Sequence, residues 1–597
     1  MQEFGAPALY HVPPDGNLID LVERNAERYP DVAVISRKVD GRWRDLTAVQ
    51  FRTEVWATAK GLIANGIQIG DRVAVLSRTR YEWTLLDFAI WCAGAVTVPV
   101  YETSSAEQVQ WVVSDSGAVA IFTETSHHTA VVTGLRDQLP KLMHVWQIDA
   151  DAIATLMRDG AGVDDTAVAD RRAAVAADAL ATIVYTSGTT GRPKGCQLTH
   201  GNFLAELGNT IARVPTLFRT GESSVLLFLP LAHVLGRIAE VAAAFAPVCI
   251  AHVSDVTNIT AELGAFRPTL ILGVPRVFEK VYNTGRTQAQ LAGRGRIFDL
   301  AATTAISYSR ALDSGRLSLS LRIRHALFDR VVYRRLRAAL GGRATHALSG
   351  GAPLGARLGH FYRGVGFTVL EGYGLTETCG AATFNPDDRP KIGTVGQPLP
   401  GSSIRIDEDG EILLRGPNVF TGYWNNPGAT AAAFRDGWFA TGDLGALDDD
   451  GFLTIIGRKK EIIVTAAGKN VAPAVIEDRI RAHAIIGEVI VVGDGKPFVS
   501  CLVTVDMDHF PTWKRLHGKP VEATVADLTA DPDLLATIQA AIDDGNRAVS
   551  HAEAVRKFHI LHTDLTEANG YVTPSLKLKR NIVLRDFAPE VAALYSA

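Results

Sequence analysis

The chain has 597 residues, of which 47% are apolar and 21% charged, so we expect a folded protein of about two to four domains. Its net charge of -4 gives no overall attraction to nucleic acid, and we expect no nucleic-acid partner. The five cysteines lie far apart and form no C-x-x-C pair, which argues against a disulfide framework or a zinc site and favours a reducing compartment.

Two apolar stretches approach the length of a membrane span, which needs about 20 nearly uninterrupted apolar residues. Residues 83–101 are interrupted by Asp87, and residues 225–253 by Arg237. We therefore expect both to be buried helix-turn-strand units. The amino-terminal stretch has neither the basic start nor the apolar core of a secretory signal, so we expect a cytoplasmic protein.

Short apolar runs in the first part of the chain predict buried parallel strands. These runs cover residues 72–77, 118–123, 181–187 and 269–274. Helical patterns lie between such runs, for example over residues 46–66. The alternation of strands and helices predicts an α/β fold with doubly wound sheets.

The pattern changes after about residue 390. Residues 402–416 and 448–458 predict strands joined by Asp-Gly turns. From residue 461 onwards, predicted strands and helices mix in a smaller unit. We therefore expect a separate C-terminal domain there.

Residues 294–343, the arginine-rich segment, hold eleven Arg and three Asp but no Lys or Glu. Solvated helices whose arginine stems lie along the surface would explain this bias. A face for anionic lipid, or for the phosphates of a large ligand, would explain it equally. The sequence leaves both interpretations open, and the second would allow peripheral membrane contact.

A loop rich in glycine and hydroxyl residues, YTSGTTGRPKGCQLTH, occupies residues 185–200. Successive backbone N–H groups in such a turn form a nest for anions, and Lys194 adds a positive charge. The loop differs from the NTPase pattern G-x-x-x-x-G-K-[ST], because Pro193 precedes the lysine. It follows an apolar strand, and ligands of open α/β sheets bind beyond the carboxyl ends of strands. We expect a phosphate-binding loop, with a flexible surface turn as the alternative.

Four further stretches combine glycine turns with hydroxyl, carboxylate and lysine side chains. In chain order they are LSGGAPL (348–354), EGYGLTET (371–378), DGWFATGDLGALDDDGFLTIIGRKKEIIV (436–464) and YVTPSLKLKR (571–580). Together with the loop, and in this order, they resemble the adenylate-forming family of acyl-CoA synthetases, luciferases and peptide-synthetase adenylation domains. The resemblance begins at residues 22–35 and covers nearly the whole chain.

The resemblance implies a large N-terminal domain, residues 1–458, and a small mobile α+β C-terminal domain, residues 459–597. The large domain would contain two α/β subdomains with doubly wound sheets and a distorted β-barrel at about residues 390–458. In this family the small domain rotates between two half-reactions about one hinge residue, which corresponds to Lys460. The implied cofactor is Mg²⁺, and the implied co-substrates are ATP and coenzyme A.

The same resemblance implies which residues bind ATP. The phosphate loop would hold the β- and γ-phosphates through Thr186, Ser187, Gly188, Thr189, Thr190, Gly191 and Lys194. One turn would line the adenine and a second would stack on it, and these turns contain Gly351, Ala352, Pro353, Gly372 and Tyr373. Asp443 and Arg458 match contacts to the ribose.

Three residues match the catalytic positions of the family. Thr376 corresponds to a contact with the α-phosphate and Glu377 to the magnesium ligand, and a hard carboxylate oxygen suits Mg²⁺. Lys577 corresponds to the lysine that bridges the substrate carboxylate and the α-phosphate. The family commonly has Gly before that lysine, where this chain has Leu576, so Lys579 is a competing assignment.

The acyl substrate is indicated by local similarity to long-chain fatty-acid–CoA ligases in residues 267–282, 457–473 and 573–581. His233 matches a position beside the acyl tunnel, where a structural or gating role is the main alternative to proton transfer. A long chain would gain about 0.8 kcal/mol for each buried methylene. We therefore expect a long-chain fatty acid.

Other functions stay open. A fatty acyl-AMP ligase would pass the acyl group to a carrier protein, but such enzymes typically carry an insertion that residues 461–475 do not show. A medium-chain or aryl-CoA ligase would differ in its acyl pocket. A nonenzymatic lipid- or nucleotide-binding protein is disfavoured by the intact lysines and carboxylates. The sequence indicates no obligate protein partner.

Overall fold

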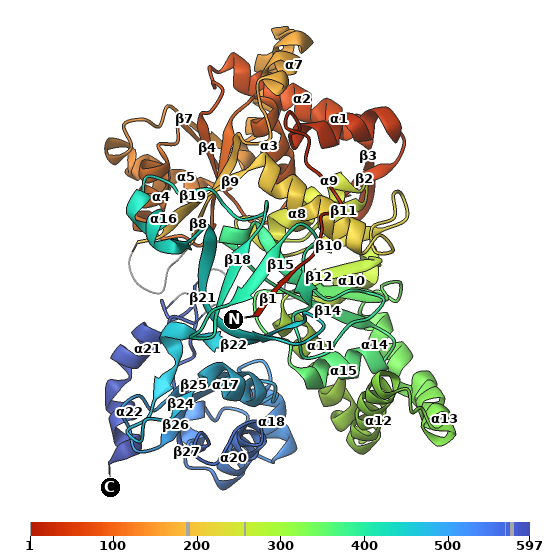
Figure 1. Ribbon diagram of the computed structural model, residues 1–597, viewed down its shortest axis with the longest axis vertical. Coiled ribbons are helices and arrows are strands. Elements are labelled where there is room, and N and C mark those ends of the chain that lie inside the picture. Colours follow the sequence, from red (N-terminus) through yellow and green to blue (C-terminus); the bar gives the residue numbers. More distant parts are fainter. Residues whose placement is uncertain (1, 187–191, 256–257, 568, 574–577, 597) are drawn as a thin grey trace.

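The computed structural model describes residues 2–186, 192–255, 258–567, 569–573 and 578–596 (Figure 1). Three large sheets lie in the part of the chain up to residue 458. A three-stranded and a two-stranded sheet lie in the rest, which is blue in Figure 1. The expected mixed α/β architecture is therefore confirmed.

The first sheet has seven strands in the order β19-β9-β8-β5-β4-β6-β7. The strands are β4 (Arg72–Leu76), β5 (Val96–Val100), β6 (Ala120–Thr123), β7 (His144–Gln147), β8 (Leu180–Thr186), β9 (Lys194–Thr199) and β19 (Gly422–Tyr423). Pairs from β8 to β7 are parallel, whereas β9 is antiparallel to both neighbours. Every residue of β5 is buried, as expected of a parallel strand covered on both faces. The three runs predicted before residue 190 are thus confirmed as β4, β6 and β8.

The second sheet has nine strands in the order β16-β15-β14-β13-β12-β10-β11-β2-β3. The strands are β2 (Ala33–Val39), β3 (Arg42–Thr47), β10 (Ser224–Leu227), β11 (Cys249–His252), β12 (Leu270–Gly273), β13 (His346–Ser349), β14 (Thr368–Leu375), β15 (Gly380–Phe384) and β16 (Gln397–Pro398). The predicted run at 269–274 is β12. Strand β14 is parallel to β13 up to Glu371 and antiparallel to β15 from Gly372 onwards.

The two long apolar stretches fold as buried helix–strand units. Residues 83–101 form most of α3 (Tyr81–Cys92) and then β5, and residues 225–253 form β10, α9 (Val234–Phe245) and β11. In the described parts of the chain, no helix has the length and apolar character to span a bilayer. The predicted helix at 46–66 is α2 (Ala48–Ala64), which begins at a Thr47 capping box.

Two charges that interrupt these stretches pair with each other in the core. Arg237 Nη2 of α9 donates to Asp87 Oδ1 of α3 at 2.6 Å, and neither side chain is exposed. Arg237 also donates to the hydroxyl of Thr182 in β8. Burial, together with the Asp87 charge, raises the pKa of Glu240 well above its usual value, so this nearby carboxyl stays neutral. Because a buried charge without its partner is strongly destabilising, the pair fixes α3 against α9 and the first sheet.

The third sheet contains the strands predicted after residue 390 and one strand from the amino terminus. They are β1 (Gln2–Gly5), β17 (Ser403–Ile406), β18 (Glu411–Arg415), β20 (Phe434–Arg435), β21 (Trp438–Leu447) and β22 (Leu453–Arg458). Asp-Gly turns join β17 to β18 and β21 to β22, with φ of +85° at Gly410 and +79° at Gly451.

The region expected to form a distorted β-barrel, residues 390–458, supplies most of this third sheet, whose strand pairing is open among the described residues. Pairing runs β1-β17-β18-β21-β20, with β22 on the other half of β21. Among the described residues, no pair joins β20 or β22 back to β1. Strand β20 has only two residues, and one edge is occupied by β1 from the far end of the sequence.

The chain beyond β22 continues through the short helix η6 (Lys459–Glu461) into a smaller α+β unit. Its strands are β23 (Ile463–Val464), β24 (Asn470–Val471), β25 (Ile486–Val492), β26 (Val499–Val505) and β27 (Val555–Ile560). Its main helices are α17 (Pro473–Arg481), α18 (Phe510–Leu516), α20 (Pro532–Asn546), α21 (Arg580–Asp586) and α22 (Ala588–Tyr595). Its buried apolar side chains form clusters of their own, separate from the core of the three large sheets.

The arginine-rich segment lies on a helical projection, the green lower right of Figure 1. The projection consists of α11 (Pro275–Leu291), α12 (Gly295–Ser314), α13 (Leu319–Phe328), the π-helical turn η4 (Asp329–Tyr333) and α14 (Arg334–Ala339). Helices α11 and α12 pack on each other through Tyr282 and Phe298, and both rings contact Phe361 of α15 (Ala356–Gly364).

Candidate active site

The carboxyl end of β14 and the turn after it carry several of the predicted residues. Glu371, within β14, accepts a hydrogen bond at its Oε1 from the backbone N–H of Leu354 at 2.9 Å. This bond holds the end of the predicted adenine turn, whose Gly351 has a φ of +85°. A Cβ built on Gly372 would lie 3.0 Å from the backbone oxygen of Thr383, so a larger residue there would crowd strand β15.

The two turns expected to enclose adenine lie side by side. A Cβ built on Gly350 would be 3.7 Å from the carbonyl oxygen of Gly372, so the two backbones nearly touch. Ala352 and Pro353 are exposed beside them, as a lining for a ligand requires. The structure therefore brings this predicted group together.

The predicted ribose contacts are paired with each other. Asp443 of β21 is buried, and its Oδ1 lies 3.0 Å from Nε of Arg458, the opposite residue of β22. Its Oδ2 accepts a hydrogen bond from the hydroxyl of Tyr373 at 2.7 Å. Burial and the Asp443 charge raise the pKa of Tyr373, so this phenol stays a donor. A carboxylate has about four lone-pair sites, so Asp443 keeps acceptor capacity for a ligand hydroxyl.

A second cluster joins Glu377 to the ends of the phosphate loop. The hydroxyl of Tyr423 donates to Glu377 Oε1 at 2.8 Å, and Lys194 Nζ lies 5.1 Å from the centroid of the Tyr423 ring. Lys194 is the register partner of Thr186, whose strand leads into the loop. Thr376 precedes Glu377 in the short helix η5 (Thr376–Thr378). One carboxylate, one ammonium and three hydroxyl residues thus lie at the loop ends.

The loop that these groups surround is described only at its ends. Ser187, Gly188, Thr189, Thr190 and Gly191 lie outside the described residues, as does Lys577. On the far side of the loop, Trp111 Nε1 donates to the carbonyl of Pro193 at 2.9 Å, and Arg192 lies over the Trp111 ring. The loop therefore starts and ends at fixed points.

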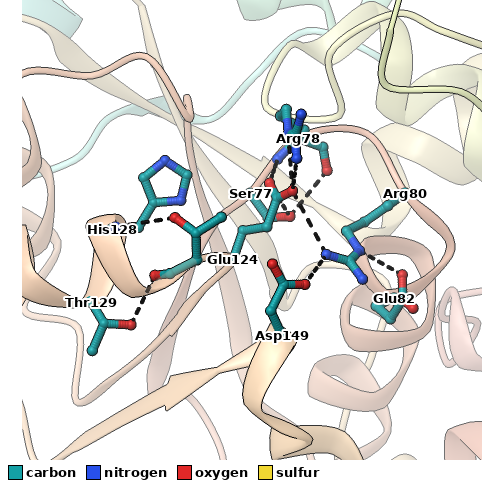
Figure 2. A network of polar contacts seen from close by, with 9 residues as sticks. Ser77, Arg78, Arg80, Glu82, Glu124, His128, Thr129 and Asp149 are labelled. Atoms are coloured by element: carbon teal, nitrogen blue, oxygen red, sulfur yellow. Dashed lines mark hydrogen bonds and ion pairs between the residues drawn. The ribbon is translucent and has the colours of Figure 1, made fainter.

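A charged network fixes neighbouring loops at the same edge of the first sheet (Figure 2). Arg78, which follows β4, donates through Nε and Nη2 to Glu124 Oε1 at 2.9 and 2.6 Å. Arg80 Nη1 donates to Asp149 Oδ1 at 2.7 Å. Burial alone would raise the pKa of Glu124, but the hydrogen bonds and charge of Arg78 hold it below the usual value. These ion pairs thus hold the loops at this edge of the first sheet in fixed positions.

Two other predicted residues lie apart from these clusters. His233 precedes α9, and its Nδ1 accepts a hydrogen bond from the backbone N–H of Leu235 at 3.1 Å, so it caps that helix. Lys460 is exposed in η6. Its neighbour Lys459 pairs with Asp409 and, at 3.0 Å, with Glu411 Oε2 of β18.

Sequence comparison agrees with this geometry. Residues 22–424 match the AMP-binding enzyme family, and residues 460–597 match the AMP-binding enzyme C-terminal domain. The chain belongs to the AMP-binding enzyme family. The long-chain-fatty-acid–CoA ligase FadD15 of Mycobacterium tuberculosis is 53% identical to it over 599 residues, covering 100% of each chain.

Solved AMP-binding enzymes share the fold at low sequence identity. The anthranilate CoA ligase AuaEII in complex with anthranoyl-AMP superposes with a TM-score of 0.72 at 18% identity, covering 98% of this chain and 99% of that one. The o-succinylbenzoate CoA synthetase MenE of Bacillus subtilis, in complex with ATP and magnesium ion, gives 0.67 at 23% identity, covering 94% and 98%.

Sequence reasoning missed three residues that contact the predicted residues of this candidate site. Tyr423 and Trp111 lie far from the loop in sequence and meet it only through the fold. Glu371 stands at the start of the EGYGLTET motif, yet its partner Leu354 belongs to another turn. The sequence offered one signal for Tyr423, which is the aromatic pair in the TGYW stretch at 421–424.

Glu371 makes stability depend on pH. Burial raises its pKa to about 7, above the value of about 4.3 for an unfolded chain. The folded chain therefore holds a proton that the unfolded chain has lost between these values, and stability falls as pH rises through this window. Glu371→Gln keeps an acceptor for Leu354 but has no proton to lose. We expect the variant to gain up to about 3 kcal/mol of unfolding free energy relative to the parent between about pH 5 and pH 8.

Denaturant titrations at both pH values would measure this difference. The exposed Glu408→Gln serves as the matched control and should follow the parent curve. Parallel curves for the parent and Glu371→Gln would contradict a raised pKa at Glu371.

Proposed function

We propose that this chain is a long-chain fatty-acid–CoA ligase. In its first step a fatty carboxylate oxygen would attack the α-phosphorus of ATP, forming acyl-AMP as pyrophosphate leaves. In its second step the sulfur of coenzyme A would attack the acyl carbonyl, giving acyl-CoA and AMP. The full-length relationship to FadD15, at 53% identity without large gaps at either end, is the observation that carries this proposal.

The first step brings an anion to a polyanion, so positive charge and alignment are most of the catalytic task. Lys194, beside the loop ends, is placed to neutralise phosphate charge. Glu377 fits a magnesium ion, because it offers hard carboxylate oxygens next to that loop and one of them already has a fixed hydroxyl partner. Bound there, Mg²⁺ would supply charge neutralisation at the phosphates. Thr376 would contact the α-phosphate, and Lys577 would bridge it to the fatty carboxylate.

The nucleoside would be held at the other cluster. The turns around Gly351 and Gly372 would line the adenine, with Tyr373 stacked on it. Asp443 would accept the ribose hydroxyls, with Arg458 as the second contact. Tyr373 and Arg458 already hold both carboxylate oxygens of Asp443 in place, so the acceptor is oriented before a ligand binds.

Domain rotation would let one site serve both steps, with residues 1–458 as the fixed domain and residues 459–597 as the mobile one. Lys459 is tied to the third sheet by ion pairs with Asp409 and Glu411. Lys460 is the next residue, is exposed, and lies in η6 directly after that tie. We therefore assign the hinge to Lys460.

The acyl chain would run beside α9. His233 begins that helix, whose residues are mostly buried and apolar, and it would line the tunnel as a gate. The alternatives remain a fatty acyl-AMP ligase that serves a carrier protein and a medium-chain or aryl-CoA ligase. The proposed setting is cytoplasmic, with peripheral membrane contact through the arginine-rich segment.

A panel of acids separates these functions. We expect pyrophosphate release with long-chain fatty acids and thioester formation only when coenzyme A is added. Acetate, medium-chain acids and a coumarate serve as comparison substrates. A preference for any of them, or adenylate formation without thioester, would contradict the proposal.

Lys577→Ala should lower adenylate formation by about 100-fold or more, because it removes the charge that stabilises the transferring phosphoryl group. Pyrophosphate release in a single turnover measures this step. Lys579→Ala is the matched control and should keep most of the parent rate. The reverse pattern would move the catalytic role to Lys579.

Lys460→Pro should leave adenylation near the parent rate and stall thioester formation, because proline fixes the φ angle about which the domain must turn. The two half-reactions are measured separately, the second from pre-formed acyl-AMP. Lys460→Ala, which keeps backbone freedom, should support both. Equal loss of both half-reactions in the proline variant would contradict a hinge at this residue.

A further inference from the structure

Helix α13 exposes a row of aliphatic side chains that the proposed reaction does not use. Leu319, Ile323 and Leu327 are four residues apart and so lie along one side of the helix. Their exposed fractions are 73, 62 and 60%. Single exposed apolar residues are ordinary on a protein surface, but a continuous row of them marks an interaction surface.

The opposite side of α13 is anchored to the protein. Leu321 and His325 come two residues after the first two members of the row, which is about 200° of rotation around the helix. Leu321 is buried, and the His325 ring stacks on Tyr308 with centroids 3.8 Å apart. His325 Nε2 also donates to the carbonyl of Gly364 at 2.6 Å. The aliphatic row therefore faces away from the body, at the outer end of the helical projection (Figure 1).

Arginines border the row on both sides. At about 100° per residue, Arg322 lies about 60° before Leu319, and Arg324 lies about 60° beyond Leu327. Both arginines are exposed, as is Arg316 just before the helix. The arginine-rich segment has a net charge of +8 from eleven Arg and three Asp, although the whole chain is at -4. Positive charge is thus concentrated around the one exposed aliphatic row of this helix.

We infer that the outer face of α13 docks the enzyme on an anionic bilayer surface. The aliphatic row would enter the boundary between headgroups and acyl chains, and the arginines would pair with lipid phosphates. A second copy is a poorer occupant, because two such faces would bring like charges together. A nucleic acid would satisfy the arginines but leave the row in water. The inference rests on the proposed function, since long-chain fatty acids partition into bilayers and an enzyme held there meets its substrate.

Vesicle co-sedimentation of the full-length enzyme tests this face. We expect binding to phosphatidylcholine vesicles that contain phosphatidylglycerol and little binding to phosphatidylcholine alone, with binding reduced by high salt. Leu319→Asn, Ile323→Asn and Leu327→Asn combined should lower binding by about tenfold or more. Arg316→Gln, Arg322→Gln and Arg324→Gln combined should do the same and should also weaken the salt dependence.

Matched controls change equally exposed residues elsewhere. Leu9→Asn, Ile69→Asn and Val521→Asn combined remove side chains that are 55, 51 and 84% exposed, and should bind as the parent does. Arg42→Gln, Arg44→Gln and Arg547→Gln combined are the control for charge. Thermal melting verifies that every variant is folded.

Three results would overturn the inference. One is parent-like vesicle binding by both α13 variants. The second is a sedimentation coefficient that differs between the parent and the aliphatic variant in the absence of vesicles, which would show that the row is a contact between copies. The third is loss of binding to duplex DNA from the arginine variant alone, with vesicle binding intact. Acyl-CoA synthesis from albumin-delivered fatty acid should be unchanged in the α13 variants, so a failure of docking stays distinguishable from a failure of the proposed function.

Discussion

The hydrogen bonds made from the end of β14 are the constraint on which the site depends. Within seven residues, Glu371 holds the turn that ends at Leu354, Tyr373 holds Asp443, and Glu377 is held by Tyr423. These partners belong to different parts of the chain: Leu354 lies in the turn after β13 of the second sheet, Asp443 in β21 of the third sheet and Tyr423 in β19 of the first. Strand β14 changes its pairing partner from β13 to β15 at this point. Side chains at its end therefore reach partners on three different parts of the chain. One strand end therefore sets the relative positions of the residues that we propose bind adenine, ribose and phosphate.

The scaffold behind this strand end is built to resist displacement. The pair of Asp87 and Arg237 lies in the core between helices and the first sheet, where breaking it would leave a buried charge. The rim around Glu124 ties together loops that follow separate parallel strands. Transfer between two anions requires pre-arranged positive charge and alignment, so rigidity on this side of the site is a chemical requirement.

Features that are encoded within a short stretch of sequence could be predicted. The parallel strands and the Asp-Gly turns each leave a signature within about ten residues, and both predictions are confirmed. The hydroxyl-rich loop leaves such a signature too, but its residues 187–191 lie outside the described residues. What the sequence could not give were contacts between distant segments: the edge strand β1, the tyrosine that meets Glu377, and the bond from Leu354 to Glu371. The excess of arginine was apparent from the sequence. The exposed fractions of the side chains were needed to tell the anchored side of α13 from its exposed side.

The strength of contacts between the two domains differs with position, and this asymmetry suits a two-step reaction. At the chain crossing, Lys459 pairs with Glu411, whose side chain is only 4% exposed. Away from the crossing, α11 meets the smaller domain through the pair of Arg276 and Asp506, which are 45 and 17% exposed, and through the pair of Lys280 and Asp508, which are 50 and 82% exposed. Exposed pairs contribute about 0 to 1 kcal/mol, so this contact can be broken and reformed at little cost. The proposed rotation about Lys460 would begin directly after the Lys459 tie and would break the exposed pair of Lys280 and Asp508 at little cost.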